Sequence, residues 1–388
     1  MKVLFISSDN KNTSGAFLCM TELCKKLRDN YNVEPFVILP FPGSGQNVLE
    51  ENNIPYKVIF SFTWLVVKSQ KNTLFQKIKR IIAKTYNHIA IYQIRKVIRK
   101  EKIEIVHINT TCTYVGAKAA KKENKLLVWH LREFLEEHSD LTLWNRPVNN
   151  QLIASAERVV TISNCLKKKY EKIVPVNQLK MIYDGIDTTQ YEGTHNIFQN
   201  EIPRFIFVGA LYKDKGIEDL LHACAIIKNQ NKPFSLWIAG QGEEDYTEYL
   251  KSMVIEFGIE QEVDFLGVRR DVNPLMSQSD IAFMCSKAEA FGRVTVEGMM
   301  AGCLVIGSNT AATAELVTHE DTGLLYSYGD VNELANRIEY ALNNKEIARK
   351  IACAGQKYAN ENFSLDRTIL SVYQLYQEML EEKNVGDV

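Results

Sequence analysis

The chain has 388 residues, of which 46% are hydrophobic and 24% charged, a balance typical of soluble globular proteins with room for two domains. Its apolar runs are too short for a membrane span or a signal peptide, and its eight cysteines form no Cys-x2-Cys pair. These features disfavour an integral membrane protein and a zinc or disulfide framework, and they favour a cytoplasmic protein. Residues 1–185 hold 29 basic and 16 acidic side chains, whereas the remainder holds 17 and 31. This asymmetry predicts one basic surface with an anionic partner.

In the first half, short apolar runs alternate with helical patterns. Strands are predicted at residues 2–7, 33–39, 55–59, 103–108, 126–130 and 159–163, with the last run and the helix after it closing the sheet. Residues 12–16 form a small-residue turn between the first strand and a helix. Strand, turn and helix in this order are typical of a phosphate-binding unit, in which Gly15 lets a ligand approach the backbone. On this pattern alone, an ordinary turn is the simpler interpretation.

Two histidines lie on the predicted strands of this half. His107 falls inside its strand and is interpreted as a core residue. His130 ends its strand, so it is expected at the carboxyl edge of a parallel sheet, where ligands bind. Position alone leaves a structural and a functional role for His130 equally open.

A polar stretch up to Glu201 has no periodicity and is predicted to be a linker. Beyond it, strands are predicted at residues 204–209, 234–239, 262–266, 280–285, 304–306 and 322–326, with helices between them and three more at 330–343, 345–361 and 365–383. Strands that alternate with helices indicate a parallel sheet in each half.

The segment between the strands at 280–285 and 304–306 concentrates candidate binding groups. Glu289 falls on the loop after the strand, and Glu297 falls in the first turns of a helix that begins near Arg293. The free N–H groups at the start of such a helix suit a phosphate. Glu289 can then reach hydroxyl groups held over the loop, and Glu297 can accept two hydrogen bonds from a vicinal diol such as a ribose. The alternative is an exposed helix with two solvated glutamates.

Residues 289–302, with the sequence EAFGRVTVEGMMAG, resemble the E-x7-E signature of the retaining glycosyltransferases of family 4, which have the GT-B fold. The resemblance extends from the turn at Gly15 to the last helices. It implies an α/β protein with two Rossmann-like domains that face each other across a cleft. The expected domains are residues 1–185, completed by 365–388, on the acceptor side, and residues 186–364 on the nucleotide-sugar side.

The resemblance also implies roles for single residues. Glu289 would contact the donor sugar, Glu297 the nucleotide ribose, Lys215 the donor phosphates and His130 the sugar. The expected catalytic residues are Glu289 and His130, and the expected donor-binding residues are Gly15, Lys215, Phe291, Gly292, Arg293 and Glu297.

The chain departs from the family pattern at two places. The turn at Gly15 keeps only one of two usual glycines, and Ala210 replaces the usual arginine. Arg293 is expected to supply the missing charge. The alternatives are a solvated loop lysine at Lys215 and a surface salt bridge at Arg293.

The implied reaction is the transfer of a sugar from a nucleotide-sugar, with a UDP-sugar favoured, to an acceptor hydroxyl with retained anomeric configuration. A lipid-linked saccharide in bacterial surface polysaccharide synthesis is the expected acceptor, and a hexosyltransferase type is expected. No Asp-x-Asp motif is present, so no required divalent metal is expected. No cofactor is expected, since the nucleotide-sugar is a substrate. The alternatives are a nucleotide-sugar 2-epimerase of the same fold and a non-catalytic partner subunit.

Residues 68–102 hold eleven basic side chains and one acidic side chain, Glu101. Apolar residues at helical spacing form two stripes, one around Leu74 to Ile82 and one around Ile91 to Ile98. One stripe must pack in the core, which leaves the one-sided charge unexplained. We expect reversible docking on an anionic membrane, at the inner face of the cell membrane. Nucleic acid is not expected, because no recognition motif accompanies the charge.

Overall fold

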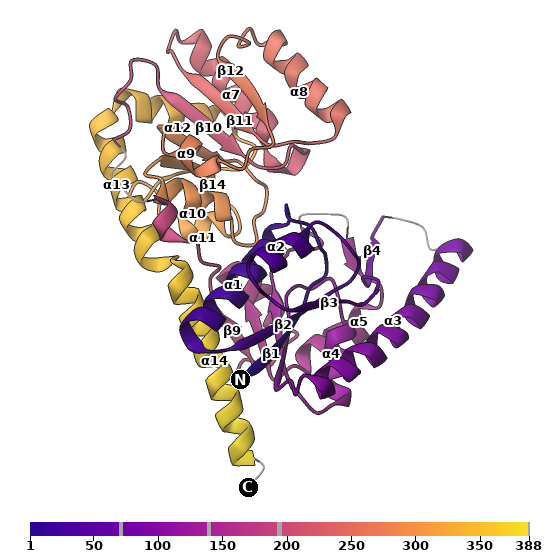
Figure 1. Cartoon of the computed structure of the whole chain (residues 1–388). Helices are drawn as coiled ribbons and strands as arrows, with labels where there is room; N and C mark the ends of the chain where they lie inside the picture. The colour runs from indigo at the N-terminus through magenta and orange to yellow at the C-terminus, as the bar shows by residue number, and fades with distance from the viewer. Residues whose placement is uncertain (70–72, 138–140, 192–195, 387–388) are drawn as a thin grey trace. The chain divides into compact units, whose positions relative to one another are not determined.

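A computed structural model of the chain describes residues 1–69, 73–137, 141–191 and 196–386. Contacts between Cα atoms divide the chain into two compact units. The N-terminal unit comprises Met1–Asp184 and Asp366–Val388, and the C-terminal unit comprises Gly185–Leu365. The prediction of an α/β protein with two domains that each contain a parallel sheet is confirmed (Figure 1).

The N-terminal unit is built on a seven-stranded sheet with the order β3-β2-β1-β5-β6-β8-β9, in which every pair is parallel. Its strands are β1 (Lys2–Ile6), β2 (Glu34–Leu39), β3 (Tyr56–Val58), β5 (Ile105–Ile108), β6 (Leu126–Leu131), β8 (Arg158–Thr161) and β9 (Leu179–Met181). Parallel strands are covered on both faces, which explains why β5 and β6 are mainly apolar and buried along their whole length.

Two features of this unit differ from the prediction. The strand at 158–161 does not close the sheet, because β9 pairs outside it at the edge. In addition, β4 (Leu65–Val67) and β7 (Leu141–Leu143) form a separate antiparallel pair. Each of these strands has three residues, which is too short for a periodic pattern in the sequence.

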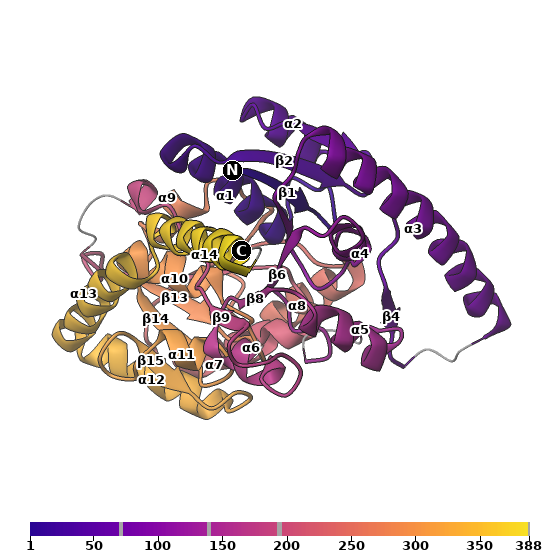
Figure 2. The ribbon, with the colours of Figure 1, turned by 90° about the horizontal axis from the view of Figure 1, so that it is seen from below.

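The helices of the N-terminal unit are α1 (Gly15–Tyr31), α2 (Gly45–Glu51), α3 (Leu74–Lys100), α4 (Val115–Lys122), α5 (Arg146–Ala154), α6 (Asn164–Tyr170) and α14 (Leu365–Gly386). Figure 2 shows α3 along the outside of the unit, next to α4. The end of α3 nearer α4 buries its stripe, since Ile94 and Ile98 are fully enclosed. In the first half of α3 the stripe is exposed, as at Leu74 and Ile81.

The C-terminal unit has a six-stranded parallel sheet with the order β12-β11-β10-β13-β14-β15. The strands are β10 (Arg204–Val208), β11 (Ser235–Ala239), β12 (Val263–Gly267), β13 (Ile281–Met284), β14 (Leu304–Ser308) and β15 (Leu324–Tyr326). The helices are α7 (Ile217–Asn229), α8 (Glu244–Glu256), α9 (Val272–Met276), α10 (Arg293–Met300), α11 (Thr313–Leu316), α12 (Val331–Asn343) and α13 (Lys345–Asn362).

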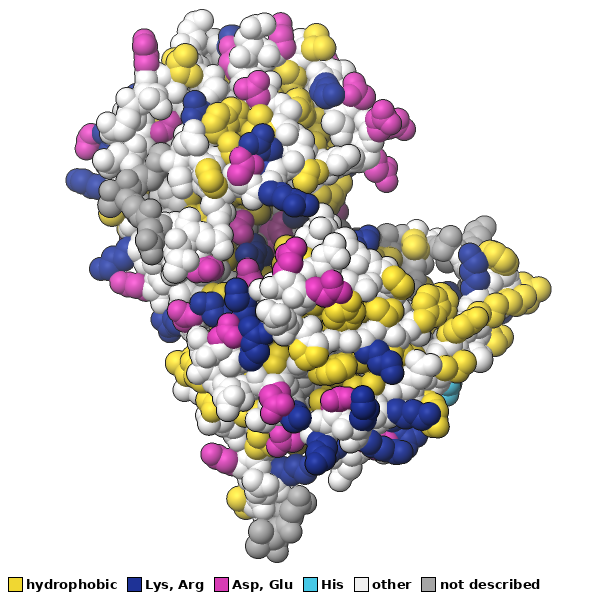
Figure 3. Space-filling view, in the orientation of Figure 1, with side chains coloured by type: hydrophobic (Ala, Val, Ile, Leu, Met, Phe, Trp, Pro, Cys, Tyr) yellow, Lys and Arg dark blue, Asp and Glu magenta, His cyan; other side chains and the backbone are white. Residues whose placement is uncertain are grey.

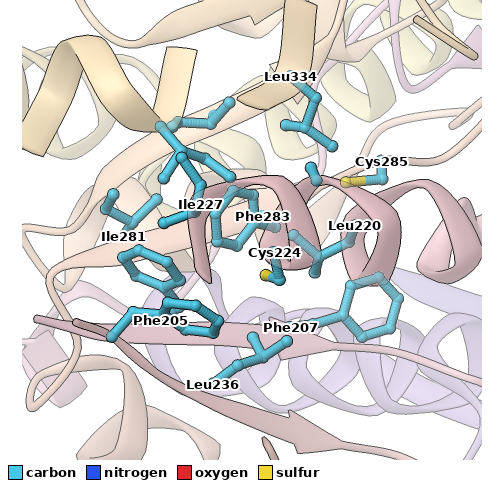
Figure 4. Packing of buried hydrophobic residues seen from close by; sticks show 14 of the residues in the cluster. Phe205, Phe207, Leu220, Cys224, Ile227, Leu236, Ile281, Phe283, Cys285 and Leu334 are labelled. Carbon is cyan, nitrogen blue, oxygen red and sulfur yellow. The ribbon is translucent and has the colours of Figure 1, made fainter. Parts of the chain in front are cut away.

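The core of the C-terminal unit lies between this sheet and the helices that cover it. Figure 4 shows Phe205, Phe207 and Phe283 of the central strands packed against Leu220 and Ile227 of α7. Burial of large apolar side chains stabilises the unit and fixes the central strands β10 and β13 side by side. The loops that follow these two strands are therefore held at one edge of the sheet.

Candidate active site

The loops after β10 and β13 contact each other closely in the C-terminal unit. Gly216 ends the first loop with φ of +68°, and a Cβ atom there would lie 2.2 Å from the carbonyl oxygen of Cys285 on the second. Only glycine therefore allows this approach. The backbone N–H of Lys287 donates to the carbonyl oxygen of Asp214 at 2.8 Å. The packing fixes Lys215, next to Gly216, beside the loop that carries Glu289.

Lys215 and Glu289 form an ion pair in which Nζ lies 2.5 Å from Oε1. Their side chains are only 17% and 14% exposed, which does not fit a solvated loop lysine or a solvated glutamate. Burial alone would lower the pKa of Lys215, but the Glu289 carboxylate and Tyr212 outweigh burial and raise that pKa. Lys215 is therefore fully charged at neutral pH, and in this structure its charge is neutralised by Glu289.

Helix α10 begins directly after the Glu289 loop. Gly292 caps it with φ of +84°, a conformation that glycine adopts readily. Arg293 and Glu297 pair across one helical turn, with Nε 3.3 Å from Oε1. The Glu297 side chain is 16% exposed. Phe291 is buried and its ring contacts that of Phe363, so it supports the loop from within the unit.

Ala210, which replaces the arginine of the family pattern, follows the carboxyl end of β10. Ala210 lines a cavity of about 450 Å³ together with Tyr212, Gln241, Gly242 and Tyr246. Gln241 accepts a backbone hydrogen bond from Leu211 at 3.0 Å, which joins the ends of β10 and β11. A side chain longer than that of Ala210 has room at this edge.

In the N-terminal unit, His130 belongs to a buried polar network. His107 Nδ1 lies 2.6 Å from the Tyr376 hydroxyl, and His107 Nε2 lies 3.2 Å from His130 Nδ1. Arg132 lies 3.4 Å from His130 Nδ1 through Nη2, donates to Asn109 Oδ1 at 3.1 Å through Nε, and pairs with Asp184. The location of His107 inside the core is confirmed.

The contacts of His130 determine which of its nitrogens carries hydrogen. An arginine only donates hydrogen bonds, so His130 Nδ1 must accept. His107 Nε2 then donates to the same atom, and His107 Nδ1 accepts from Tyr376. Burial, Arg132 and His107 hold the pKa of His130 well below its usual range, so the ring is neutral. The hydrogen of His130 therefore sits on Nε2, which is buried and has no hydrogen-bond partner among the described residues.

The first turn of α1 lies next to this network. Asn109 joins the two, because its Nδ2 donates to the carbonyl oxygen of Ala16 at 2.8 Å. Ser14 caps the helix through its hydroxyl and donates to Asp9 Oδ2 at 2.9 Å. A Cβ atom on Gly15 would meet no other atom within 4 Å, so the fold itself does not require glycine there.

The structure thus groups the predicted residues into two clusters. Lys215, Glu289, Arg293 and Glu297 lie together in the C-terminal unit, and His130 and Gly15 lie in the N-terminal unit. Sequence reasoning missed Arg132 and Asn109 as partners of the histidine. Arg132 could have been found, because it follows His130 at the same strand end. Among the residues that the structure describes, no group of three or more His, Cys, Asp or Glu side chains could hold a metal ion.

Comparison with protein families gives two matches. The model described as "Glycosyl transferases group 1" matches residues 194–358, and the model described as "Glycosyltransferase Family 4" matches residues 13–190. A relative from Bacillus anthracis, N-acetyl-alpha-D-glucosaminyl L-malate synthase, is 24% identical over 312 residues, which are 76% of this chain and 79% of the relative.

Solved structures resemble this chain over nearly its whole length. Anabaena HepE in complex with UDP-glucose is 25% identical with a TM-score of 0.79, covering 97% of this chain and 100% of that one. A glycosyltransferase from Rickettsia africae is 19% identical with a TM-score of 0.79, covering 98% of each chain. The second likeness concerns the fold alone.

Proposed function

Because the chain belongs to the group 1, family 4 glycosyltransferases and has their GT-B fold, we propose that it transfers a hexose from a UDP-sugar to an acceptor hydroxyl with retained anomeric configuration. The observation that carries the proposal is the buried pair of Lys215 and Glu289 at the carboxyl edge of a parallel sheet. Glu289 lies on the loop that leads directly into α10, which carries Arg293 and Glu297. The likeness to a structure that holds UDP-glucose supports the choice of donor.

In the proposed mechanism the donor reorganises the two ion pairs. The donor phosphates bind the Lys215 ammonium group. Glu289 is then free to accept hydrogen bonds from the sugar hydroxyls. Glu297 accepts from the ribose diol, and Arg293 turns to the phosphates. Lys215, Arg293 and the first N–H groups of α10 then stabilise the charge that develops on the leaving UDP. These cations support a reaction without a required metal, which EDTA treatment of the purified protein tests.

His130 has a defined part in this mechanism. Because its neutral ring carries hydrogen on Nε2, it donates a hydrogen bond to an oxygen of the donor sugar and does not remove a proton from the acceptor. We propose that the leaving phosphate takes the acceptor proton, as the front-face mechanism of the family implies. Gly15 gives the ligand a close approach to the start of α1.

Nucleotide binding and turnover test the proposal together. UDP at 100 times its Kd should raise the free energy of unfolding by about 2.7 kcal/mol. The other nucleoside diphosphates at the same concentration should raise it less. UDP-glucose should be hydrolysed slowly without acceptor, and Lys215→Gln should lower this rate about 100-fold. Nuclear magnetic resonance of the product shows whether the transferred sugar has kept its anomeric configuration. A protein that binds UDP without turnover would be the non-catalytic partner subunit, and one that inverts the sugar at C2 would be the epimerase.

We propose a lipid-linked saccharide acceptor at the inner face of the cell membrane, as in surface polysaccharide synthesis. The exposed stripe of α3 supports this, because Leu74 and Phe75 are 75% and 65% exposed and basic residues such as Lys77 and Lys79 lie on the same helix. Figure 3 shows hydrophobic and basic side chains next to one another on the surface. Among the described residues, no helix is long and apolar enough to cross a membrane. An exposed basic amphipathic helix suits docking in the interface of an anionic bilayer.

Vesicle sedimentation tests the docking step separately. The chain should bind vesicles that contain phosphatidylglycerol and should be released by salt, because each basic residue near such a surface contributes about 1 kcal/mol. Lys77→Gln with Lys79→Gln should weaken binding, whereas Lys100→Gln with Lys102→Gln, beyond the exposed stripe, should weaken it less. Equal binding to neutral and anionic vesicles would contradict docking by charge.

A further inference from the structure

A second cavity lies inside the N-terminal unit, among α3, α4 and α5. Its volume is about 500 Å³, within the range of small-molecule sites. Trp64 and Tyr114 line it and stack on each other with ring centroids 5.1 Å apart. Both rings are almost fully buried, so they form a rigid wall. None of the residues assigned to the sugar-transfer site lines this cavity.

Three lysines line the cavity without any carboxylate among the lining residues. They are Lys84 of α3 and Lys118 and Lys121 of α4, and none of them forms an ion pair with a carboxylate in the described part of the chain. By contrast, Arg95 and Arg99 of α3 share Glu123. Burial, together with Lys122 and Lys84, lowers the pKa of Lys118. The described lining of the cavity therefore carries a net positive charge.

Aromatic rings hold two of these ammonium groups in place. Lys84 Nζ lies 5.0 Å from the centroid of the Trp144 ring, and Lys118 Nζ lies 5.0 Å from that of Tyr114. Cation–π contacts of this kind orient a lysine without cancelling its charge. Trp144, which is partly exposed, also offers a flat apolar surface at the cavity.

A buried amide completes the lining. Asn149 of α5 is 5% exposed, and its Nδ2 has no hydrogen-bond partner among the described residues. A buried donor without a partner is unfavourable, so such groups are nearly always satisfied by a ligand or by water. The donors around this cavity, amide and ammonium, all require an acceptor, and the ammonium groups require an anion.

We propose that this cavity binds a phosphate ester whose phosphate contacts Lys84, Lys118, Lys121 and Asn149 and whose organic part lies against Trp144. A phosphate fits three ammonium groups better than a single carboxylate does, because it carries more charge and more acceptor oxygens. The volume exceeds that of a phosphate and leaves space for a sugar.

The position of the cavity suggests where the phosphate comes from. Lys84 belongs to α3, and the exposed stripe of that helix includes Ile81 and Ile82, close to Lys84 in sequence. The phosphate that links a lipid to its saccharide would enter from this side. This step rests on the proposed function, because it makes the cavity the phosphate subsite of the lipid-linked acceptor. A soluble sugar phosphate offers the same chemistry.

Calorimetric titration of the full chain with inorganic pyrophosphate tests the shared chemistry, with saturating UDP present so that the donor site is occupied. Lys118→Gln with Lys121→Gln should weaken binding at least tenfold. Lys77→Gln with Lys79→Gln, on α3 outside the cavity, should leave it unchanged. Asn149→Leu should also weaken binding several-fold. The double variant at Lys118 and Lys121 is called the pocket variant. Because these two lysines are exposed, their exchange should not lower Tm, which is measured for every variant.

Vesicles separate the two sources of phosphate. The parent should prefer phosphatidylcholine vesicles with phosphatidic acid over vesicles with phosphatidylserine of the same surface charge, and the pocket variant should lose this preference while still binding both. Pyrophosphate binding without the lipid preference would assign the cavity to a soluble phosphate ester. No pyrophosphate binding, or equal binding by parent and pocket variant, overturns the proposal. Hydrolysis of UDP-glucose in the same preparations reports on the sugar-transfer function independently.

Discussion

Acidification should destabilise the N-terminal unit through its buried histidines. Burial and the Arg132 charge lower the pKa of His107 from 6.5 to about 3. A depressed pKa means that the stabilisation is complete above pH 6.5 and is lost as pH falls toward 3, because only the unfolded chain binds the proton in that window. Each pH unit there costs about 1.4 kcal/mol, so His107 alone should remove about 2 kcal/mol between pH 7 and pH 5. His130 should act in the same direction.

Urea denaturation followed by tryptophan fluorescence measures this loss, since Trp64, Trp129 and Trp144 lie in the N-terminal unit and only Trp237 lies in the other. His107→Gln keeps a polar side chain but cannot bind the proton. For the parent and the variant, the free energy of unfolding at pH 5 is subtracted from that at pH 7. The contributions of titrating groups that both proteins share cancel when the two differences are compared. The parent should lose about 2 kcal/mol more than the variant. An equal loss in both proteins would refute the depressed pKa of His107 and the neutral state inferred from it.

Three further predictions concern the sugar-transfer site. Glu297→Gln should weaken the binding of UDP itself. Glu289→Gln should keep UDP binding, because it frees the buried charge of Lys215, but should lower turnover about 100-fold. Unchanged UDP affinity in both variants, measured by calorimetry, would contradict the contact of Glu297 with the ribose. Arg293→Ala should lower turnover of UDP-glucose more than it lowers uridine binding, and Ala210→Arg should restore part of the turnover. Kinetics equal to those of the parent would mean that Arg293 has a structural role, such as its pair to Glu297, and none in transfer. Gly216→Ala should destabilise the C-terminal unit by about 1–3 kcal/mol or more. Gly15→Ala should leave Tm unchanged and lower only donor turnover. A lower Tm in Gly15→Ala would show that the fold requires that glycine.

The sequence was informative where function depends on residues close together in the chain. The strand, loop and helix around Glu289 could be predicted because alternating strands and helices dictate a parallel sheet, and its carboxyl edge collects the loops. Exposure of the first half of α3 could not be predicted, since both of its stripes have the same helical spacing and only packing distinguishes them.

The contacts that define His130 and the phosphate cavity were beyond sequence reasoning for a different reason. His107 and Tyr376 are 269 residues apart, and neither residue carries a periodic signal that points to the other. The cavity gathers lining residues from three helices, among them Lys84, Lys118 and Asn149. Each of these residues alone is indistinguishable from an ordinary surface lysine or helix asparagine.

The return of α14 to the N-terminal unit has a consequence for how the protein is made. Its buried face, with Ile369, Val372 and Tyr376, belongs to the first unit, and the Tyr373 ring stacks on Tyr31 of α1 at 4.3 Å. During synthesis on the ribosome, these residues emerge only after all of Gly185–Leu365. The second unit is therefore complete in sequence while the first still lacks a helix of its core and the hydroxyl that orients His107. A nascent chain therefore cannot assemble the histidine network until Tyr376 has emerged, after the whole of the second unit.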